Sequence, residues 1–410
     1  MTQSQRGDAP AYANVMVAVD NSEWSSNAVD VAVDLARATG AHLTGVHVYA
    51  SRLHDARFRQ LEPGLPDRYQ AEEILRRQRD IHDDLIGRGL KLISDSYLDV
   101  FEEKCRRAGV VAERKTPEGR NYEQLVRDAR ESRYDLVVVG AHGLGHVDRS
   151  TLGSVCERVT RLAECDVLVV RDGRPLGSGG LLVAIDGSAH SFGALDAALD
   201  ISLVYASQVS AVAAYDPFFH GVAFKSIAGV ISGEAARLFR FREQEQLHDE
   251  IIDRGLAEAY RAHLVQARRI ASRRGVALQI ELLEGKPFDA IARHVERVRP
   301  AALVVGRVGV HHGEGVTLGS TAENLLRLVG CNVLVVGRTA DGADPEAAGD
   351  EAAAAGPEIR WHEEAERRLE RIPPFARPMA RRAIEEFART NGHAEITLEV
   401  YEQARQRFRG

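Results

Sequence analysis

A glycine-rich pattern occurs twice in the 410-residue chain. The first copy is Gly140–Gly143 (GAHG), nine further residues, and then Gly153-Ser154-Val155. The second copy is Gly306–Gly309 (GRVG), nine further residues, and then Gly319-Ser320-Thr321. Glycine lets the backbone turn tightly and approach a ligand without a Cβ in the way. The free N–H groups of a helix start, the helix dipole and a serine hydroxyl together favour an anion, of which phosphate is the natural example.

A carboxylate stands at the end of an apolar run in each copy. Asp20 follows VMVAV, and Asp186 follows LLVAI. In an open parallel sheet, ligands bind outside the carboxyl ends of the strands where the strand order reverses, and the first strand flanks that crevice. A carboxylate there could accept hydrogen bonds from a ribose or an adenine amino group, or hold a metal ion that bridges phosphates.

The two patterns belong to an internal duplication. The segment VMVAVDNSEWS at 15–25 reappears as LLVAIDGSAHS at 181–191, an offset of 166 residues. The same offset relates the aspartates, the glycines of both patterns, and Cys165 to Cys331. One offset that holds over whole segments indicates two copies of one domain.

Within each copy, short runs of Val, Ile and Leu alternate with longer amphipathic stretches, which predicts strands and helices around a doubly wound five-stranded parallel sheet. The predicted strands are at 15–19, 42–48, 110–114, 135–139 and 166–170, and at 181–185, 208–214, 276–283, 301–305 and 332–336. The stretches 68–108 and 235–274 predict long helices that pack on the sheet, in the first case through Ile74, Ile81, Leu85 and Leu92. A partner-binding face is the alternative for these apolar residues.

The glycine spacing, the aspartate after the first strand and His47-Val48 near the end of the second resemble the ATP-binding branch of the universal stress protein family, with its G-x2-G-x9-G-[ST] motif. The resemblance spans about residues 14–338 and implies domains at 14–173 and 178–338, packed as an intramolecular pseudo-dimer that could pair again between chains. It implies ATP, with Mg²⁺ as a possible companion, at two sites. Site 1 would comprise Asp20, the backbone of Val48, Gly140, Gly143, Gly153, Ser154 and Val155. Site 2 would comprise Asp186, Ala214, Gly306, Gly309, Gly319, Ser320 and Thr321.

The two copies differ inside the glycine loop. His142 of the first copy is replaced by Val308 in the second, and Arg307 enters the second loop. Arg307 could either clamp a phosphate or block the pocket, so site 1 carries the stronger prediction. The alternative is that one or both loops are turns kept only for folding.

The chain continues beyond the second copy with a different composition. Residues 339–357 are small and acidic, which predicts a flexible linker. Residues 358–410 predict three helical pieces with the apolar faces Trp361/Ala365/Leu369/Ile372, Ala380/Ile384/Phe387 and Leu398/Tyr401/Ala404/Phe408. This module resembles the small helical domain that ends the B subunit of light-independent protochlorophyllide reductase. The resemblance implies either contact with a tetrapyrrole-synthesis enzyme or a reused interaction module for an unknown protein partner.

Composition excludes several other classes. The formal net charge of −7 argues against a nucleic-acid partner. None of the five lysines stands in a Walker-type phosphate loop, and the four cysteines include no C-x-x-C pair. No signal peptide or membrane-spanning run is recognisable, so a cytoplasmic location is expected. His142/His146 and His311-His312 lack a third ligand at a suitable spacing, so no metal site is predicted.

The sequence therefore predicts a nucleotide-dependent regulatory or stress-response protein. Two alternatives stay open: an enzyme that slowly hydrolyses ATP or transfers its phosphoryl group, and an adaptor that works through residues 358–410. Catalysis is the weaker alternative, because no general base or arginine finger is identifiable.

Overall fold

The computed structural model describes residues 11–216, 253–310, 313, 315–340, 360–370, 381, 384–385, 387–388, 391, 393 and 395–407. The chain divides into two compact units, residues 1–342 and 343–410. No described helix is both long enough and apolar enough to cross a bilayer.

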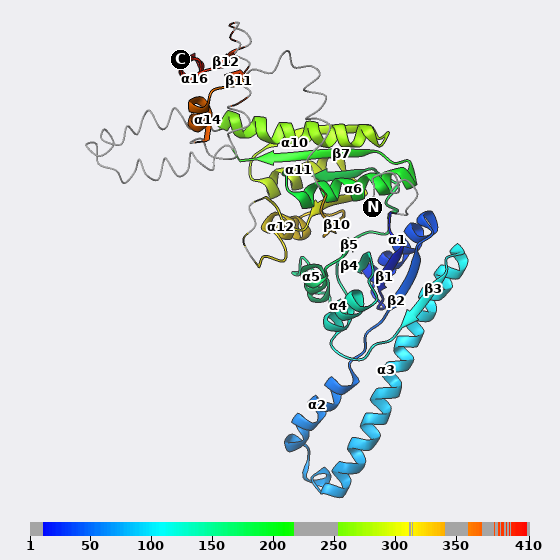
Figure 1. The fold of residues 1–410 in the computed structure, drawn as a ribbon. Coiled ribbons are helices and arrows are strands. Elements are labelled where there is room, and N and C mark those ends of the chain that lie inside the picture. The colour runs from blue at the N-terminus through cyan, green and yellow to red at the C-terminus, as the bar shows by residue number, and fades with distance from the viewer. Residues whose placement is uncertain are drawn as a thin grey trace, which may run out of the picture. The chain divides into compact units, whose positions relative to one another are not determined.

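The first unit is built on one ten-stranded sheet (Figure 1). The strands lie within two residues of their predicted bounds, so the strand predictions are confirmed. The first repeat has the order β3-β2-β1-β4-β5, with β1 (Asn14–Ala18), β2 (His42–Val46), β3 (Ala112–Lys115), β4 (Leu136–Gly140) and β5 (Asp166–Val170). The second has the order β10-β9-β6-β7-β8, with β6 (Leu181–Ala184), β7 (Val209–Tyr215), β8 (Leu278–Glu284), β9 (Ala302–Gly306) and β10 (Asn332–Val336).

The repeats meet at strands β5 and β10, which pair antiparallel with Leu168 opposite Leu334. The other strand pairs of this sheet are parallel, so each repeat is a five-stranded parallel half of a shared sheet. This agrees with the intramolecular pairing implied by the family resemblance, whereas pairing between chains stays a prediction.

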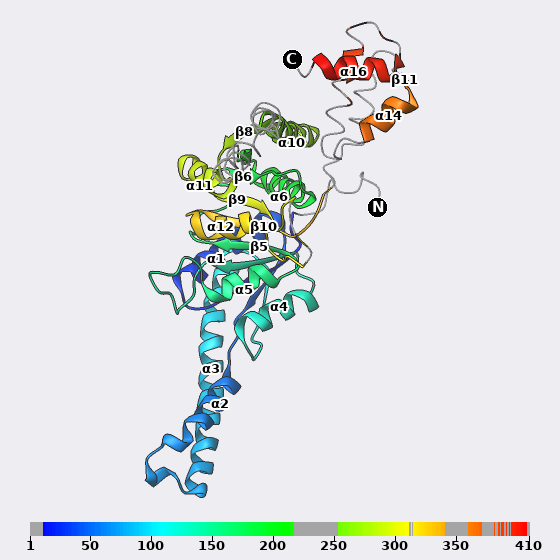
Figure 2. The ribbon, with the colours of Figure 1, turned by 90° about the vertical axis from the view of Figure 1, so that its left-hand side faces the viewer.

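Helices cover both faces of the sheet (Figure 2). One core contains side chains of α1 (Glu23–Thr39), α3 (Glu72–Ala108), α6 (Ala189–Tyr205) and α10 (Asp253–Arg273). The opposite core contains side chains of α4 (Asn121–Glu131), α5 (Ser154–Leu162), α11 (Pro287–Val298) and α12 (Ser320–Leu328). Consecutive strand residues such as Val15 and Met16 point into different cores, which is why inner strands such as β4 and β9 are apolar on consecutive residues. The edge strands β3 and β8 carry charged residues instead.

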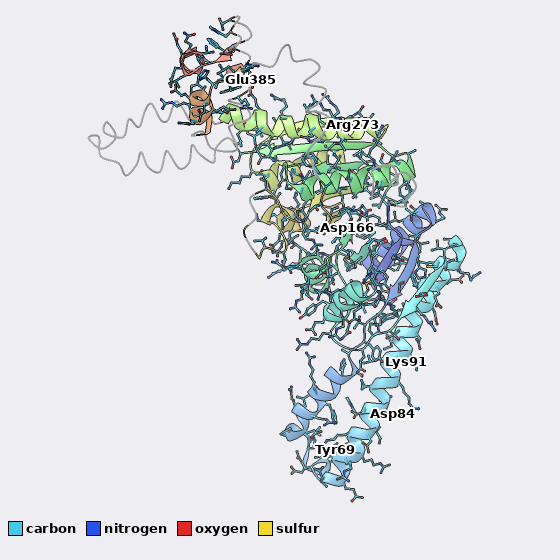
Figure 3. The ribbon with its side chains drawn as sticks, in the orientation of Figure 1. Tyr69, Asp84, Lys91, Asp166, Arg273 and Glu385 are labelled. Carbon is cyan, nitrogen blue, oxygen red and sulfur yellow. The ribbon has the colours of Figure 1, made fainter. Side chains whose placement is uncertain are left out.

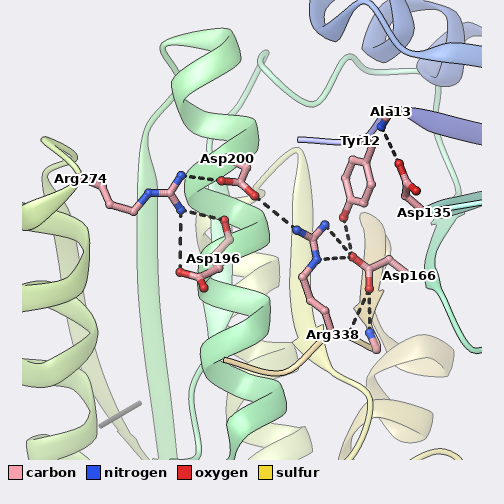
Figure 4. A network of polar contacts seen from close by, with 9 residues as sticks. Tyr12, Ala13, Asp135, Asp166, Asp196, Asp200, Arg274 and Arg338 are labelled. Atoms are coloured by element: carbon pink, nitrogen blue, oxygen red, sulfur yellow. Dashed lines mark hydrogen bonds and ion pairs between the residues drawn. The ribbon is translucent and has the colours of Figure 1, made fainter. Parts of the chain in front are cut away.

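A buried polar network joins the repeats near the β5–β10 pair (Figure 4). The Asp166 carboxylate is 3% exposed and accepts hydrogen bonds from the Tyr12 hydroxyl at 2.9 Å and the Gly337 amide at 2.8 Å. The Arg338 guanidinium lies 2.9 Å from the same carboxylate and 3.3 Å from Asp200. Burial and the Asp166 charge raise the pKa of Tyr12, so its hydroxyl remains a donor. The network ties the segment before β1 to the segment after β10.

The long helix α3 corrects one prediction. Ile74, Ile81, Leu85 and Leu92 were expected to pack on the sheet, but these side chains are 39–70% exposed. Burial against the sheet begins at Ser94 and continues through Leu98, Phe101 and Cys105. The reason is length: a helix of 37 residues extends about 55 Å, far beyond a strand of five residues. The counterpart stretch 235–252 lies outside the described residues, while α10 packs on β7 and β8.

The outer half of α3 pairs instead with α2 (Ser51–Leu61), followed by the short 3-10 turns Glu62–Gly64 and Asp67–Tyr69. Together they form an arm that projects from the α/β body, along which Tyr69, Asp84 and Lys91 are labelled in Figure 3. The Arg79 guanidinium donates two hydrogen bonds, of 2.6 and 2.7 Å, to the Glu62 carboxylate. These contacts join α3 to the turn that follows α2.

The second unit contains more than helices. A short parallel sheet pairs β11 (Arg360–Trp361) with β12 (Glu395–Ile396), beside α14 (Glu363–Glu370) and α16 (Leu398–Arg407). Trp361 therefore lies in a strand, which the sequence did not predict. The small core contains Ala365, Leu369, Ile384, Ala388, Ile396, Val400, Tyr401 and Ala404. The predicted core positions Ile372, Ala380 and Phe408, and most of the predicted linker, lie outside the described residues.

Candidate functional site

Two cavities open at the carboxyl ends of the parallel strands, one in each repeat. Site 1 has a volume of about 490 Å³ and site 2 about 470 Å³, both within the usual range for small-molecule sites. Site 1 lies beside β1, where the chain order of the strands reverses between β2 and β4. The structure brings together in one lining all the residues predicted for site 1: Asp20, Val48, Gly140, Gly143, Gly153, Ser154 and Val155. It does the same for site 2 with Asp186, Ala214, Gly306, Gly309, Gly319, Ser320 and Thr321.

The first glycine of each motif has a packing role. A Cβ on Gly140 would lie 2.8 Å from the carbonyl carbon of Trp24, and one on Gly306 would lie 2.8 Å from that of His190. Glycine at these strand ends therefore lets the backbone touch the first turn of α1 or α6. This differs from the reason derived from the sequence, which was close approach of a ligand.

The third glycine of each motif holds two loops together. The Gly153 amide donates to the Ala141 carbonyl at 2.7 Å, and the Gly319 amide donates to the Arg307 carbonyl at 2.8 Å. These bonds place the starts of α5 and α12 against the strand-end loops. The first amides of a helix have no carbonyl partner within the helix, so each cavity receives a helix start suited to an anion.

The two strand-end aspartates lie against the same loops. Asp186 accepts hydrogen bonds from the Ser188 amide at 2.9 Å and the Val310 amide at 3.0 Å. Asp20 accepts from the Ser22 amide at 2.8 Å, and a Cβ on Gly143 would lie 2.8 Å from its other oxygen. The Ser188 hydroxyl also donates to Asp186, at 2.6 Å. A carboxylate has about four acceptor positions, so Asp186 keeps about one for a ligand donor and Asp20 keeps more. Ser188 caps α6 by accepting from the Ser191 amide, as the sequence predicted.

Arg307 neither clamps a ligand in site 2 nor blocks the cavity. Its guanidinium points across the repeat boundary and donates to the carbonyls of Thr160 at 2.7 Å and Cys165 at 2.8 Å. Burial lowers its pKa, and the Cys165 and Asp166 side chains oppose that shift. Arg307 therefore has a structural role at the repeat boundary, and neither of the two roles suggested by the sequence holds.

The first repeat also supplies an arginine that crosses the repeat boundary, but from a different sequence position than Arg307. Arg171 donates to the carbonyl of Leu326, the equivalent of Thr160. The repeat-equivalent of Arg307 is Ala141, and that of Arg171 is Gly337, whose Cβ would lie 3.3 Å from Arg307 Nε. Gly337 thus leaves room for the Arg307 side chain of its own repeat.

An aromatic cluster of His142, His146 and Trp24 lies at site 1, and the sequence pointed only to the two histidines. His142 and His146 approach through their Nδ1 atoms at 3.0 Å, and both rings lie within about 5 Å of the Trp24 ring. Nδ1 to Nδ1 contact requires one ring to donate and the other to accept. Burial, then the charges of His146 and Arg171, lower the pKa of His142. Both histidines line the cavity and could donate to a phosphate.

The lowered pKa of His142 predicts a pH effect on stability. The unfolded chain takes up the proton below a pH of about 6.5, while the folded chain resists it, so the free energy of unfolding falls as the pH drops through this range. Val308 at the equivalent position supplies the control variant, His142→Val. Denaturant unfolding between pH 7.5 and 5 should show a steeper loss for the wild type than for the variant. Equal slopes would contradict the prediction.

Other lining residues were also missed. Asn121 and Leu125 from α4 line site 1, and their repeat equivalents Pro287 and Ile291 from α11 line site 2. The repeat offset was a signal that could have found them. Tyr260 from α10 lines site 2 without such a signal, since its equivalent Ser94 is a buried residue of α3 that is absent from the lining of site 1. Among the described residues no group of three metal-ligating side chains lies together, and His311 and His312 fall outside them.

Two family models match the chain. The model of the universal stress protein family matches residues 11–171 and again 180–337. The model described as the proto-chlorophyllide reductase 57 kD subunit matches residues 361–405. The first model covers more than half of the chain, and the second covers most of the small C-terminal unit.

Individual proteins agree with the first match. Universal stress protein YxiE of Bacillus subtilis is 29% identical over 160 residues, which is 39% of this chain and 99% of that protein. The crystal structure of a universal stress protein from Archaeoglobus fulgidus shares the fold, with a TM-score of 0.51 and 16% identity over 79% of this chain and 97% of the other. A universal stress protein solved in complex with cAMP is 28% identical over 39% of this chain and 97% of its own, with a TM-score of 0.25.

Proposed function

The chain belongs to the universal stress protein family, and from this premise we propose that it binds ATP or a related adenine nucleotide at sites 1 and 2 and acts as a nucleotide-dependent regulatory protein. The observation that carries the proposal is the same cavity, built twice: a glycine loop, a helix start and a strand-end aspartate around a space of about 470–490 Å³.

The lining fits the parts of a nucleotide. The amides at the starts of α5 and α12, with the hydroxyls of Ser154 and Ser320, suit phosphates. The apolar walls, which include Val48 in site 1 and Ala214 in site 2, suit an adenine ring. Asp20 or Asp186 could supply the single carboxylate with which proteins often hold Mg²⁺ beside phosphates.

Slow ATP hydrolysis at site 1 is a second candidate, because the His142–His146 pair could accept a proton from an attacking water molecule. Neither described lining includes a lysine that could neutralise a departing phosphate. Single-turnover analysis of bound ATP separates hydrolysis from simple binding, since hydrolysis no faster than that of free ATP would exclude the enzyme.

The match at 361–405 supports an adaptor role for the C-terminal unit. Pull-downs with a chain that ends near residue 345 test this role.

The regulatory proposal is tested by nucleotide content. Purified protein is denatured, the released nucleotides are separated by ion-exchange chromatography, and the stripped protein is titrated with ATP by calorimetry. We expect up to two equivalents of adenine nucleotide per chain. The absence of both retained nucleotide and binding of added ATP would contradict the proposal.

A further inference from the structure

Four charged side chains form a ring between the two helices that begin at the glycine motifs. Glu157 and Arg161 lie on α5, and Glu323 and Arg327 occupy the equivalent positions on α12. Each arginine contacts the glutamate of the other repeat as well as the glutamate four residues before it on its own helix. The ring therefore spans the repeat boundary.

The two arginines are not equal. Arg327 Nη2 lies 2.7 Å from Glu157 Oε1 and 2.9 Å from Glu323 Oε1, so it donates to both carboxylates. Arg161 Nη2 lies 3.0 Å from Glu323 Oε1 but 3.9 Å from Glu157 Oε1. Glu323 thus has two close partners, whereas Glu157 has only one close partner within the ring.

Both glutamates face the candidate sites. Glu157 lines site 1 and Glu323 lines site 2, each in the first turn of the helix whose start is suited to phosphate. An unpaired carboxylate at that place would repel a polyphosphate. The negative charge of Glu157 is therefore balanced mainly by an arginine that the second repeat supplies.

We propose that Arg327 is a positioning residue of site 1, although it belongs to the second repeat. It neutralises Glu157 and holds its carboxylate away from the phosphates, so site 1 is complete only when the repeats are packed together. Site 2 tolerates the loss of either arginine, because Glu323 keeps a partner within about 3 Å in both cases. The inference rests on the proposed nucleotide binding.

The test compares Arg327→Gln with Arg161→Gln in the full-length protein, by calorimetric titration with ATP. Each site is measured alone in a background variant. Ser320→Glu disables site 2 and so isolates site 1, and Ser154→Glu disables site 1 and so isolates site 2. Arg327→Gln should weaken site 1 between about threefold and thirtyfold, because Glu157 and Arg327 are 38% and 42% exposed and water screens part of the effect. Arg161→Gln should change either site less than about twofold. Arg327→Lys should restore part of the affinity, and 0.5 M NaCl should shrink the difference.

A double-mutant cycle separates this role from a purely structural one. Glu157→Gln should strengthen site 1, and in that background Arg327→Gln should have little further effect, since the charge to be neutralised is gone. Additive losses, or an Arg327→Gln protein that binds at both sites like the wild type, would overturn the inference while the proposed function stands. If the wild type binds no adenine nucleotide, the proposed function fails, and the inference fails with it.

Discussion

We expect Ser154→Glu to abolish nucleotide binding at the proposed site 1 and to leave the protein folded. Ser154 is the first residue of α5. A glutamate there would place its own carboxylate at the anion-binding helix start, where its negative charge would repel the phosphate. Acidic residues stabilise the first turn of a helix by about 0.3–1 kcal/mol, so the melting temperature should not fall. Calorimetric titration should show about a hundredfold weaker binding at site 1, roughly 2.7 kcal/mol, and an unchanged site 2.

Matched variants define this result. Ser320→Glu should remove site 2 alone, the double variant should bind no nucleotide, and Ser154→Thr should keep site 1 because the hydroxyl is retained. Gly153→Val is a poorer probe, since its Cβ would lie 3.0 Å from the Ala141 carbonyl oxygen and would displace the loop. Two full equivalents bound to Ser154→Glu would show that phosphate does not sit at the start of α5.

Asp166→Ala will destabilise the fold more than any surface change. The variant leaves the buried Tyr12 hydroxyl and the Gly337 amide without their acceptor and removes the carboxylate paired with Arg338. A buried donor left without its acceptor costs about 1–3 kcal/mol. The Arg338 guanidinium adds less to this cost, because it is 34% exposed and keeps Asp200 as a partner at 3.3 Å. Chemical denaturation of wild type and variant measures the free energy of unfolding.

The second repeat provides the control for this variant. Asn332 occupies the equivalent position, where its side-chain oxygen accepts from the Arg171 and Asp172 amides. Asp166→Asn should therefore keep an acceptor for the Gly337 amide and lose less stability than Asp166→Ala. A loss below about 1 kcal/mol for Asp166→Ala would show that the network contributes little.

The sequence by itself determined the strands, the duplication and the glycine, aspartate and serine positions that line both sites, but not the lining residues of α4, α10 and α11. Inner strands whose two faces are both covered by helices are apolar on consecutive residues, so strands such as β4 and β9 were visible locally. The lining of each site comes from strand ends and from loops at fixed spacing, such as Asp20, Gly140 and Ser154, and a constant offset transfers it to the second repeat. The predicted packing of the outer half of α3 on the sheet was wrong. Helical periodicity predicts which face of a helix is apolar but not which element covers that face, and α3 is longer than its sheet.

Only the tertiary structure decided what the long charged side chains do. Arg307 stands in a glycine loop, yet it donates hydrogen bonds to carbonyls about 140 residues away in the other repeat. Arg327 pairs with Glu157 at a separation of 170 residues, and the sequence motif marks neither residue. A guanidinium on a flexible stem binds whichever acceptors the packing brings within its reach, and that packing is set by the join between β5 and β10 rather than by the residues around the arginine.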